Sequence, residues 1–144
     1  MKLSTRLLIS IFLLPFVGIQ AVADDAAPTV SDAHAFLGDA IGSGLIRDAG
    51  LRRTYHNYQG RNCRSLMDVG EGGDVTSIDW SLVTSIDSSD NAVNLNGTIF
   101  RSTPGHRYNV YVAHFNIPDK VTTHRLAKAM KLLMNSCHKK SEFD

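Results

Sequence analysis

Residues 118–137 read PDKVTTHRLAKAMKLLMNSC, and this stretch decides the fold. Its apolar residues recur at spacings of three and four, which is the pattern of an amphipathic helix. The apolar stripe consists of Leu126, Ala129, Met130, Leu133 and Cys137. Lys128, Lys131 and Asn135 fall off the stripe and predict a solvated face. We therefore expect this helix to pack on the body of the protein, and we interpret the preceding chain as the surface that it covers.

The stripe ends in one of only two cysteines, Cys63 and Cys137. We expect the two to form a disulfide that holds the C-terminal helix against the first strands. Such a bond closes a loop of about 75 residues and is worth about 4–5 kcal/mol in the chain-entropy model. A redox-active or metal-binding pair usually has the C-x-x-C spacing, which is absent here. The spacing therefore favours a structural role.

The segment from residue 75 to residue 115 alternates apolar and polar residues, which predicts antiparallel strands with one buried and one solvated face. A turn cluster at 88–91 and a Pro-Gly pair at 104–105 divide it into hairpins. Residues 63–69 predict a further short strand, followed by a glycine-rich loop at 70–73. Residues 45–51 are consistent with a short continuation of helix before a strand near Tyr55.

A first helix is predicted near the start of the domain, with Ser31 as its N-cap and Gly42 at its end. The fold class is therefore α+β: an N-terminal helix, an antiparallel meander sheet of about five or six strands, and a closing C-terminal amphipathic helix. In architecture this arrangement resembles the pleckstrin-homology type, although no motif ties the chain to that family. Such scaffolds carry many unrelated functions.

The chain opens MKLSTRLLISIFLLPFVGIQAVADD, which is the pattern of a secretory signal peptide. Lys2 and Arg6 precede an apolar run of 13 residues, Leu7 to Ile19, and an A-x-A cleavage signal ends at Ala23. A membrane-spanning helix needs about 20 apolar residues. We therefore predict a signal peptide at 1–23 and one small periplasmic or secreted domain at 24–144, with no membrane span after cleavage.

Cleavage removes two of the 15 Lys and Arg residues, so the exported chain has 13 against 14 Asp and Glu, a formal charge of −1. A near-neutral balance gives no indication of a nucleic-acid partner. The six histidines are dispersed, and no two have the spacing that places imidazoles on one metal ion. We expect no metal site, no cofactor and no catalytic site. His34 falls between stripe residues and is expected to be exposed.

Three functions remain open. The first is an exported protein-binding module, an immunity or inhibitor protein that neutralises a toxin or hydrolase of the cell envelope. The second is a small secreted enzyme or effector, which requires His114 or His56 to meet a carboxylate in a pocket. The third is a binder of lipid or another small ligand, which requires an apolar cavity between the sheet and Leu126, Met130 and Leu133.

We favour the first function, with another protein as the partner, and leave the oligomeric state open. Aromatic and arginine side chains dominate many protein interfaces, and turn loops reach into partner clefts. The candidate partner contacts are Trp80, Asp90, Asn91, Glu71, Asp74, Tyr108 and Tyr111.

Overall fold

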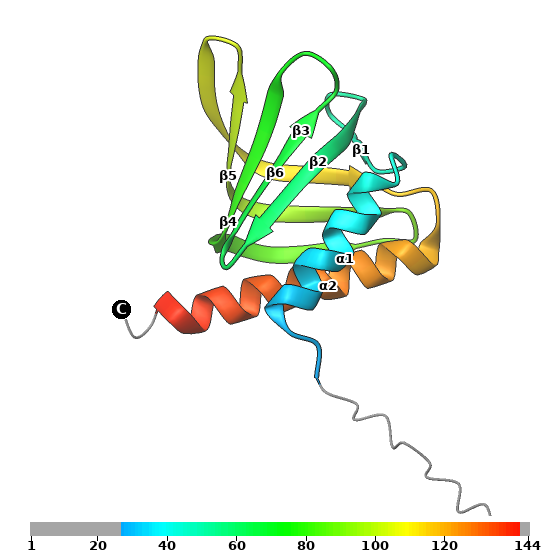
Figure 1. The fold of residues 1–144 in the computed structure, drawn as a ribbon, viewed down its shortest axis with the longest axis vertical. Helices are drawn as coiled ribbons and strands as arrows, with labels where there is room; N and C mark the ends of the chain where they lie inside the picture. The colour runs from blue at the N-terminus through cyan, green and yellow to red at the C-terminus, as the bar shows by residue number, and fades with distance from the viewer. Residues whose placement is uncertain (1–26, 142–144) are drawn as a thin grey trace, which may run out of the picture.

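The computed structural model describes residues 27–141, and the signal-peptide prediction for residues 1–23 lies outside them (Figure 1). The described chain runs from a helix through six strands to a second helix. The elements are α1 (Val30–Gly42), β1 (Arg47–Asp48), β2 (Arg53–Arg61), β3 (Arg64–Val69), β4 (Asp74–Ser88), β5 (Ala92–Thr103), β6 (His106–Asn116) and α2 (Lys120–Ser141). The α+β class, the meander order and the closing helix are confirmed.

The sheet closes into a barrel in the order β1-β2-β3-β4-β5-β6, with every neighbouring pair antiparallel. Closure depends on β1, in which Arg47 pairs with Asn116 and Asp48 with Phe115 of β6. The prediction of a helical continuation at residues 45–51 is wrong. A strand of two residues is too short to show a period-two pattern, so the sequence does not reveal this closing element.

The two helices pack on each other, with α1 on β2 and α2 on β4 (Figure 1). Leu126, Met130 and Leu133 of α2 are fully buried against core residues that include Trp80 of β4. The apolar stripe predicted for residues 118–137 is therefore confirmed. On the other face of the helix, Lys128, Lys131 and Asn135 are exposed, as the pattern predicted.

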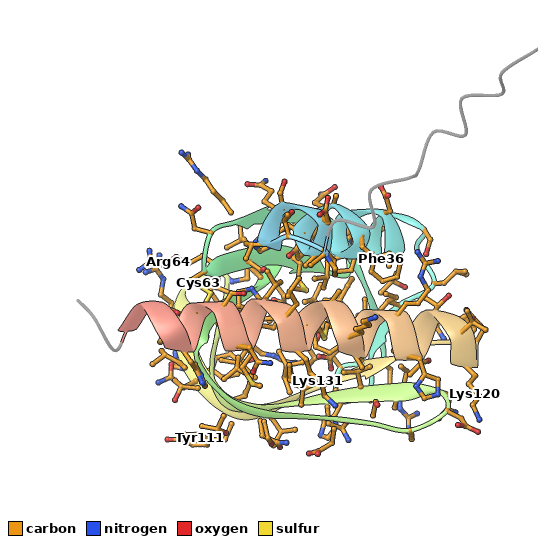
Figure 2. All side chains as sticks on the ribbon, turned by 90° about the horizontal axis from the view of Figure 1, so that it is seen from below. Phe36, Cys63, Arg64, Tyr111, Lys120 and Lys131 are labelled. Carbon is orange, nitrogen blue, oxygen red and sulfur yellow. A yellow bond between two sulfur atoms is a disulfide. The ribbon has the colours of Figure 1, made fainter. Side chains whose placement is uncertain are left out.

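Cys63 and Cys137 form the predicted disulfide, with their Cα atoms 5.6 Å apart. Cys63 lies in the short turn between β2 and β3, where Figure 2 labels it beside the late turns of α2. The bond therefore fixes the last helix to the second hairpin of the barrel. Because Cys137 is almost completely buried, the bond is part of the core.

Helix α1 ends at Gly42, as predicted, but the residues that cap its two ends differ from the prediction. The N-cap is Thr29, not Ser31, because the Thr29 hydroxyl accepts from the Asp32 backbone N–H while the Asp32 carboxylate accepts from the Thr29 backbone N–H. The Thr29 hydroxyl also donates to the Asp32 carboxylate, and this bond together with that from the Thr29 backbone N–H holds the pKa of Asp32 below its ordinary value. At the other end Gly44, not Gly42, adopts the left-handed conformation, with φ +73°.

Gly97 on β5 is required by a close approach of two strands. A Cβ built at this position would lie 2.3 Å from the Leu82 carbonyl oxygen of β4, and the glycine has φ +145°. We expect Gly97→Ala to lower the free energy of unfolding by about 2 kcal/mol or more, since it adds both backbone strain and a clash with backbone. Urea denaturation, followed by the fluorescence of the buried Trp80, measures this change.

Gly42→Ala is the matched control for this substitution. A Cβ at Gly42 meets no atom within 4 Å, and the residue is helical. Alanine is favoured over glycine in a helix by about 0.5–1 kcal/mol, so this variant should be at least as stable as the parent. Equal effects of the two substitutions would contradict the close-packing account of Gly97.

Candidate protein-binding surface

Trp80 is not a surface residue, and its assignment as a partner contact is wrong. Its side chain is fully buried, and its indole N–H donates to the Ser65 hydroxyl at 2.8 Å. Burial alternates along β4 and places Ile78 and Trp80 on its inner face. This agrees with the period-two alternation predicted for the segment. Trp80 is therefore a core anchor that joins β4 to β3.

His34 is also buried, contrary to the expectation of exposure. Its Nε2 lies 2.8 Å from the Asn62 carbonyl oxygen, so Nε2 carries the proton and donates. Its Nδ1 then accepts from the Tyr58 hydroxyl at 2.7 Å, and Tyr58 lies 2.8 Å from the Ser65 hydroxyl. Burial raises the pKa of Tyr58 to about 12. This chain joins α1 to β2 and β3, and its burial favours a structural role over catalysis.

A second buried polar cluster surrounds Asp48 of β1. The Asp48 carboxylate is paired with the Arg101 guanidinium of β5, accepts from the Tyr55 hydroxyl at 2.5 Å, and accepts from the Leu51 backbone N–H at 2.7 Å. Tyr55 also stacks on Phe115, with 4.8 Å between ring centroids. Burial and the neighbouring carboxylate raise the pKa of Tyr55 above its ordinary value. The cluster fixes the closing strand to β2, β5 and β6.

The acidic turn residues proposed as contacts lie at opposite ends of β4. At one end, Glu71 is exposed in the turn before β4, and Asp74 forms an ion pair with Arg53 at 2.5 Å. At the other end, Asp90 pairs with Lys120 at 3.0 Å. Beside it, the Asn91 carbonyl accepts from the Ile117 backbone N–H. The predicted contact residues therefore do not form one site.

Several large exposed apolar side chains lie on the outer face of the sheet instead. Four residues form a row across four strands in direct register: Leu66, Ser77, Phe100 and Asn109. Val75 and Arg107 lie two residues before Ser77 and Asn109 on β4 and β6, on the same face. Tyr111 lies on β6 two residues beyond Asn109, the partner of Phe100. We define the outer-sheet patch as Leu66, Val75, Phe100, Arg107 and Tyr111.

The outer-sheet patch surrounds a surface hollow of about 400 Å³, which is lined by Leu66, Val75, Phe100 and Arg107 together with Tyr108 and other strand residues. Leu66 is 39% exposed, Phe100 40% and Tyr111 73%. Figure 2 shows Tyr111 projecting from the barrel away from α2. Tyrosine and arginine are enriched among the residues that dominate binding at protein interfaces, and exposed apolar side chains that lie together mark interaction sites. The two tyrosines named from the sequence therefore lie in or beside this surface.

One feature of the sequence indicates this patch: large apolar residues occupy strand positions that face solvent. In the strand at 92–103 the buried residues are Val93, Leu95 and Ile99, so Phe100 falls on the polar phase. Leu66 is in the same situation between buried Ser65 and Met67. A large apolar residue on the solvated phase indicates a surface contact, but only the strand register shows that Leu66 and Phe100 share one row.

The histidines considered for catalysis lie on the barrel surface. His114 is exposed and contacts the Asn94 side chain at 2.7 Å. His56 lies 4.0 Å from the Asp68 carboxylate, with both side chains about one-third exposed. Neither residue lines the hollow of the outer-sheet patch. Within residues 27–138, no group of three or more His, Cys, Asp or Glu side chains is arranged to hold a metal ion.

The space beneath α2 is occupied by side chains. Leu126, Met130 and Leu133 are each 0% exposed, and they belong to one continuous core cluster with the barrel interior. A ligand-binding function would require an apolar cavity at these residues. The packing does not support such a cavity. Neither helix within the described range has the length and apolar character needed to cross a bilayer.

The search for similar proteins found no match among protein-family models, curated proteins or solved structures.

Proposed function

We propose that this protein is an exported protein-binding module, and that it acts as an immunity or inhibitor protein against a toxin or hydrolase of the cell envelope. The observation that carries the proposal is the outer-sheet patch, in which Leu66, Phe100 and Tyr111 expose large apolar surface. Exposing such groups in a cluster is unfavourable in water, and covering them with a partner removes that cost.

The rigidity of the scaffold supports the same proposal. The barrel, the disulfide and the buried Asp48 cluster hold the strands that carry the patch. A preformed surface loses little conformational entropy when it binds, which favours tight inhibition. The disulfide also agrees with an oxidising compartment, as the predicted signal peptide requires.

The test has two steps, capture and inhibition. The exported chain, with its disulfide formed, is used as bait in envelope extracts of the source cells and of competing strains, and a captured enzyme or toxin is then purified. We expect its activity to fall stoichiometrically as the protein is added. Activity that stays unchanged at saturating protein would overturn the inhibitor proposal.

The outer-sheet patch makes a sharper prediction for the same assay. Phe100→Ala and Tyr111→Ala should each weaken binding of the captured protein by about tenfold or more, because truncation removes a large aromatic contact. The free energy of unfolding should change little, since both side chains are substantially exposed. Val121→Ala is the matched control, because Val121 is 69% exposed but lies on α2. Equal affinity of all three variants would place the binding site elsewhere.

A further inference from the structure

The charges of the protein are segregated, although their sum is close to zero. The whole chain has 15 Lys and Arg against 14 Asp and Glu. Between Lys120 and His138, however, the sequence contains four Lys and Arg residues and no Asp or Glu. Arg125, Lys128 and Lys131 are exposed along this part of α2. The second helix therefore presents a basic face that the overall composition conceals.

This basic face borders a groove between the two helices. The groove has a volume of about 610 Å³. Figure 2 looks onto α2, with α1 and its Phe36 alongside. The groove is lined by apolar Pro28, Ala33, Phe36, Ala129 and Leu132, and by polar Asp32, Arg125, Lys128, Lys131 and Asn135. We call it the interhelical groove. Its apolar residues come from both helices, and its cations all come from α2.

The cations of the groove are not neutralised within the described part of the chain. Arg125 lies over the Phe36 ring, 4.6 Å from its centroid, and so bridges α2 to α1 without meeting an acid. The one carboxylate of the groove, Asp32, accepts hydrogen bonds from the Thr29 N–H and hydroxyl. Among residues 27–138, no carboxylate forms an ion pair with Lys128 or Lys131.

We propose that the interhelical groove binds an acidic amphipathic helix of a partner protein. A partner helix that lies between α1 and α2 buries its own apolar stripe on the apolar residues of the groove. It then packs against both helices. Aspartate or glutamate beside that stripe then meets Lys128 and Lys131. The groove and the outer-sheet patch are built from different elements, so this inference does not rest on the proposed inhibitor function.

The shape of the groove favours a helix over a membrane or a nucleic acid. A phosphate backbone is bound by cations, and it gains nothing from contact with the apolar side chains of Phe36, Ala129 and Leu132. A lipid surface is contacted by convex, protruding apolar side chains, whereas this apolar floor lies in a concave groove with Phe36 half-buried beneath Arg125. An amphipathic helix matches both the apolar floor and the basic rim.

The probe for this proposal is a fluorescent synthetic peptide of about 18 residues, with leucine at positions i, i+3, i+4 and i+7 and glutamate on the flanks. Binding to the exported chain is measured by fluorescence anisotropy. We expect saturable binding that weakens as salt is raised from about 50 to about 500 mM, because the ion pairs are exposed to solvent. A second peptide with the same glutamates and serine in place of leucine should bind at least about tenfold more weakly.

The charge-reversal variant K128E/K131E should lose about tenfold or more in affinity for the leucine–glutamate peptide. Both lysines are exposed, so the variant should fold, and its circular dichroism spectrum checks this. The variant R61E/R64E is the matched control. It reverses two exposed charges on β2 and β3, outside the groove, and should bind the peptide within about twofold of the parent.

Three results would overturn the proposal. If the serine peptide binds as tightly as the leucine peptide, the surface recognises charge alone. If R61E/R64E weakens binding as much as K128E/K131E, the attraction is not localised in the groove. If the protein binds vesicles of anionic phosphatidylglycerol but not the peptide, and K128E/K131E abolishes that binding, the basic face is a membrane contact.

Discussion

Removal of the disulfide, in the variant C63A/C137A, is expected to lower the free energy of unfolding by about 4–5 kcal/mol. The two cysteines are 74 positions apart, so the bond restricts more than half of the 144-residue chain in the unfolded state. Domains of this size have a total stability of about 5–15 kcal/mol. We therefore expect the variant to be marginally stable at physiological temperature.

Denaturation of the variant and of the parent, followed by Trp80 fluorescence, measures this loss. Trp80 is the single tryptophan and is fully buried, so its emission reports exposure of the core. The parent, unfolded in the presence of a thiol reductant, should give the same midpoint as the variant. A difference of less than about 1 kcal/mol between the oxidised parent and the variant would contradict the chain-entropy account.

Replacement of Asp48 is the second change with a large expected effect. Asp48→Ala should lower the free energy of unfolding by about 3–5 kcal/mol, because it leaves the Arg101 guanidinium buried without its counter-charge. The Arg101 side chain is 10% exposed and that of Asp48 is 1% exposed, so water replaces little of the lost interaction. The Tyr55 hydroxyl also loses its acceptor.

A double-mutant cycle separates the ion pair from its surroundings. Arg101→Met keeps most of the side-chain volume and removes the charge, so D48A/R101M should be less destabilised than the sum of the single variants. Asp39→Ala removes an exposed carboxylate from α1 and should change stability by less than about 0.5 kcal/mol. Additive effects at Asp48 and Arg101 would show that the two residues are not coupled.

The fold was predictable where it depends on local patterns. The stripe of Leu126, Met130 and Leu133 predicted both the last helix and its buried face, because helical periodicity and burial are linked residue by residue. Strand alternation predicted the hairpins of β4, β5 and β6 in the same way. The disulfide followed from an even cysteine count in a chain for which we predict an export signal.

What could not be predicted depends on contacts between distant residues. Asp48 has no sequence feature that distinguishes it from a solvated turn aspartate, and only the pairing of β1 with β6 brings it to Arg101. His34 is buried because Tyr58 and Asn62 supply partners across 24 and 28 positions. The outer-sheet patch likewise exists only through strand register, so composition and periodicity point to single residues and not to the surface.

The pairing of β1 with β6, which closes the barrel, also has a consequence for the order of folding events. Pairing of Arg47 with Asn116 and bonding of Cys63 to Cys137 both join the early part of the chain to its late part. During folding, the meander hairpins form from neighbouring residues, whereas these two links need residues 116–137 to be in place. Docking of the last helix therefore determines when the barrel closes and Cys63 meets Cys137.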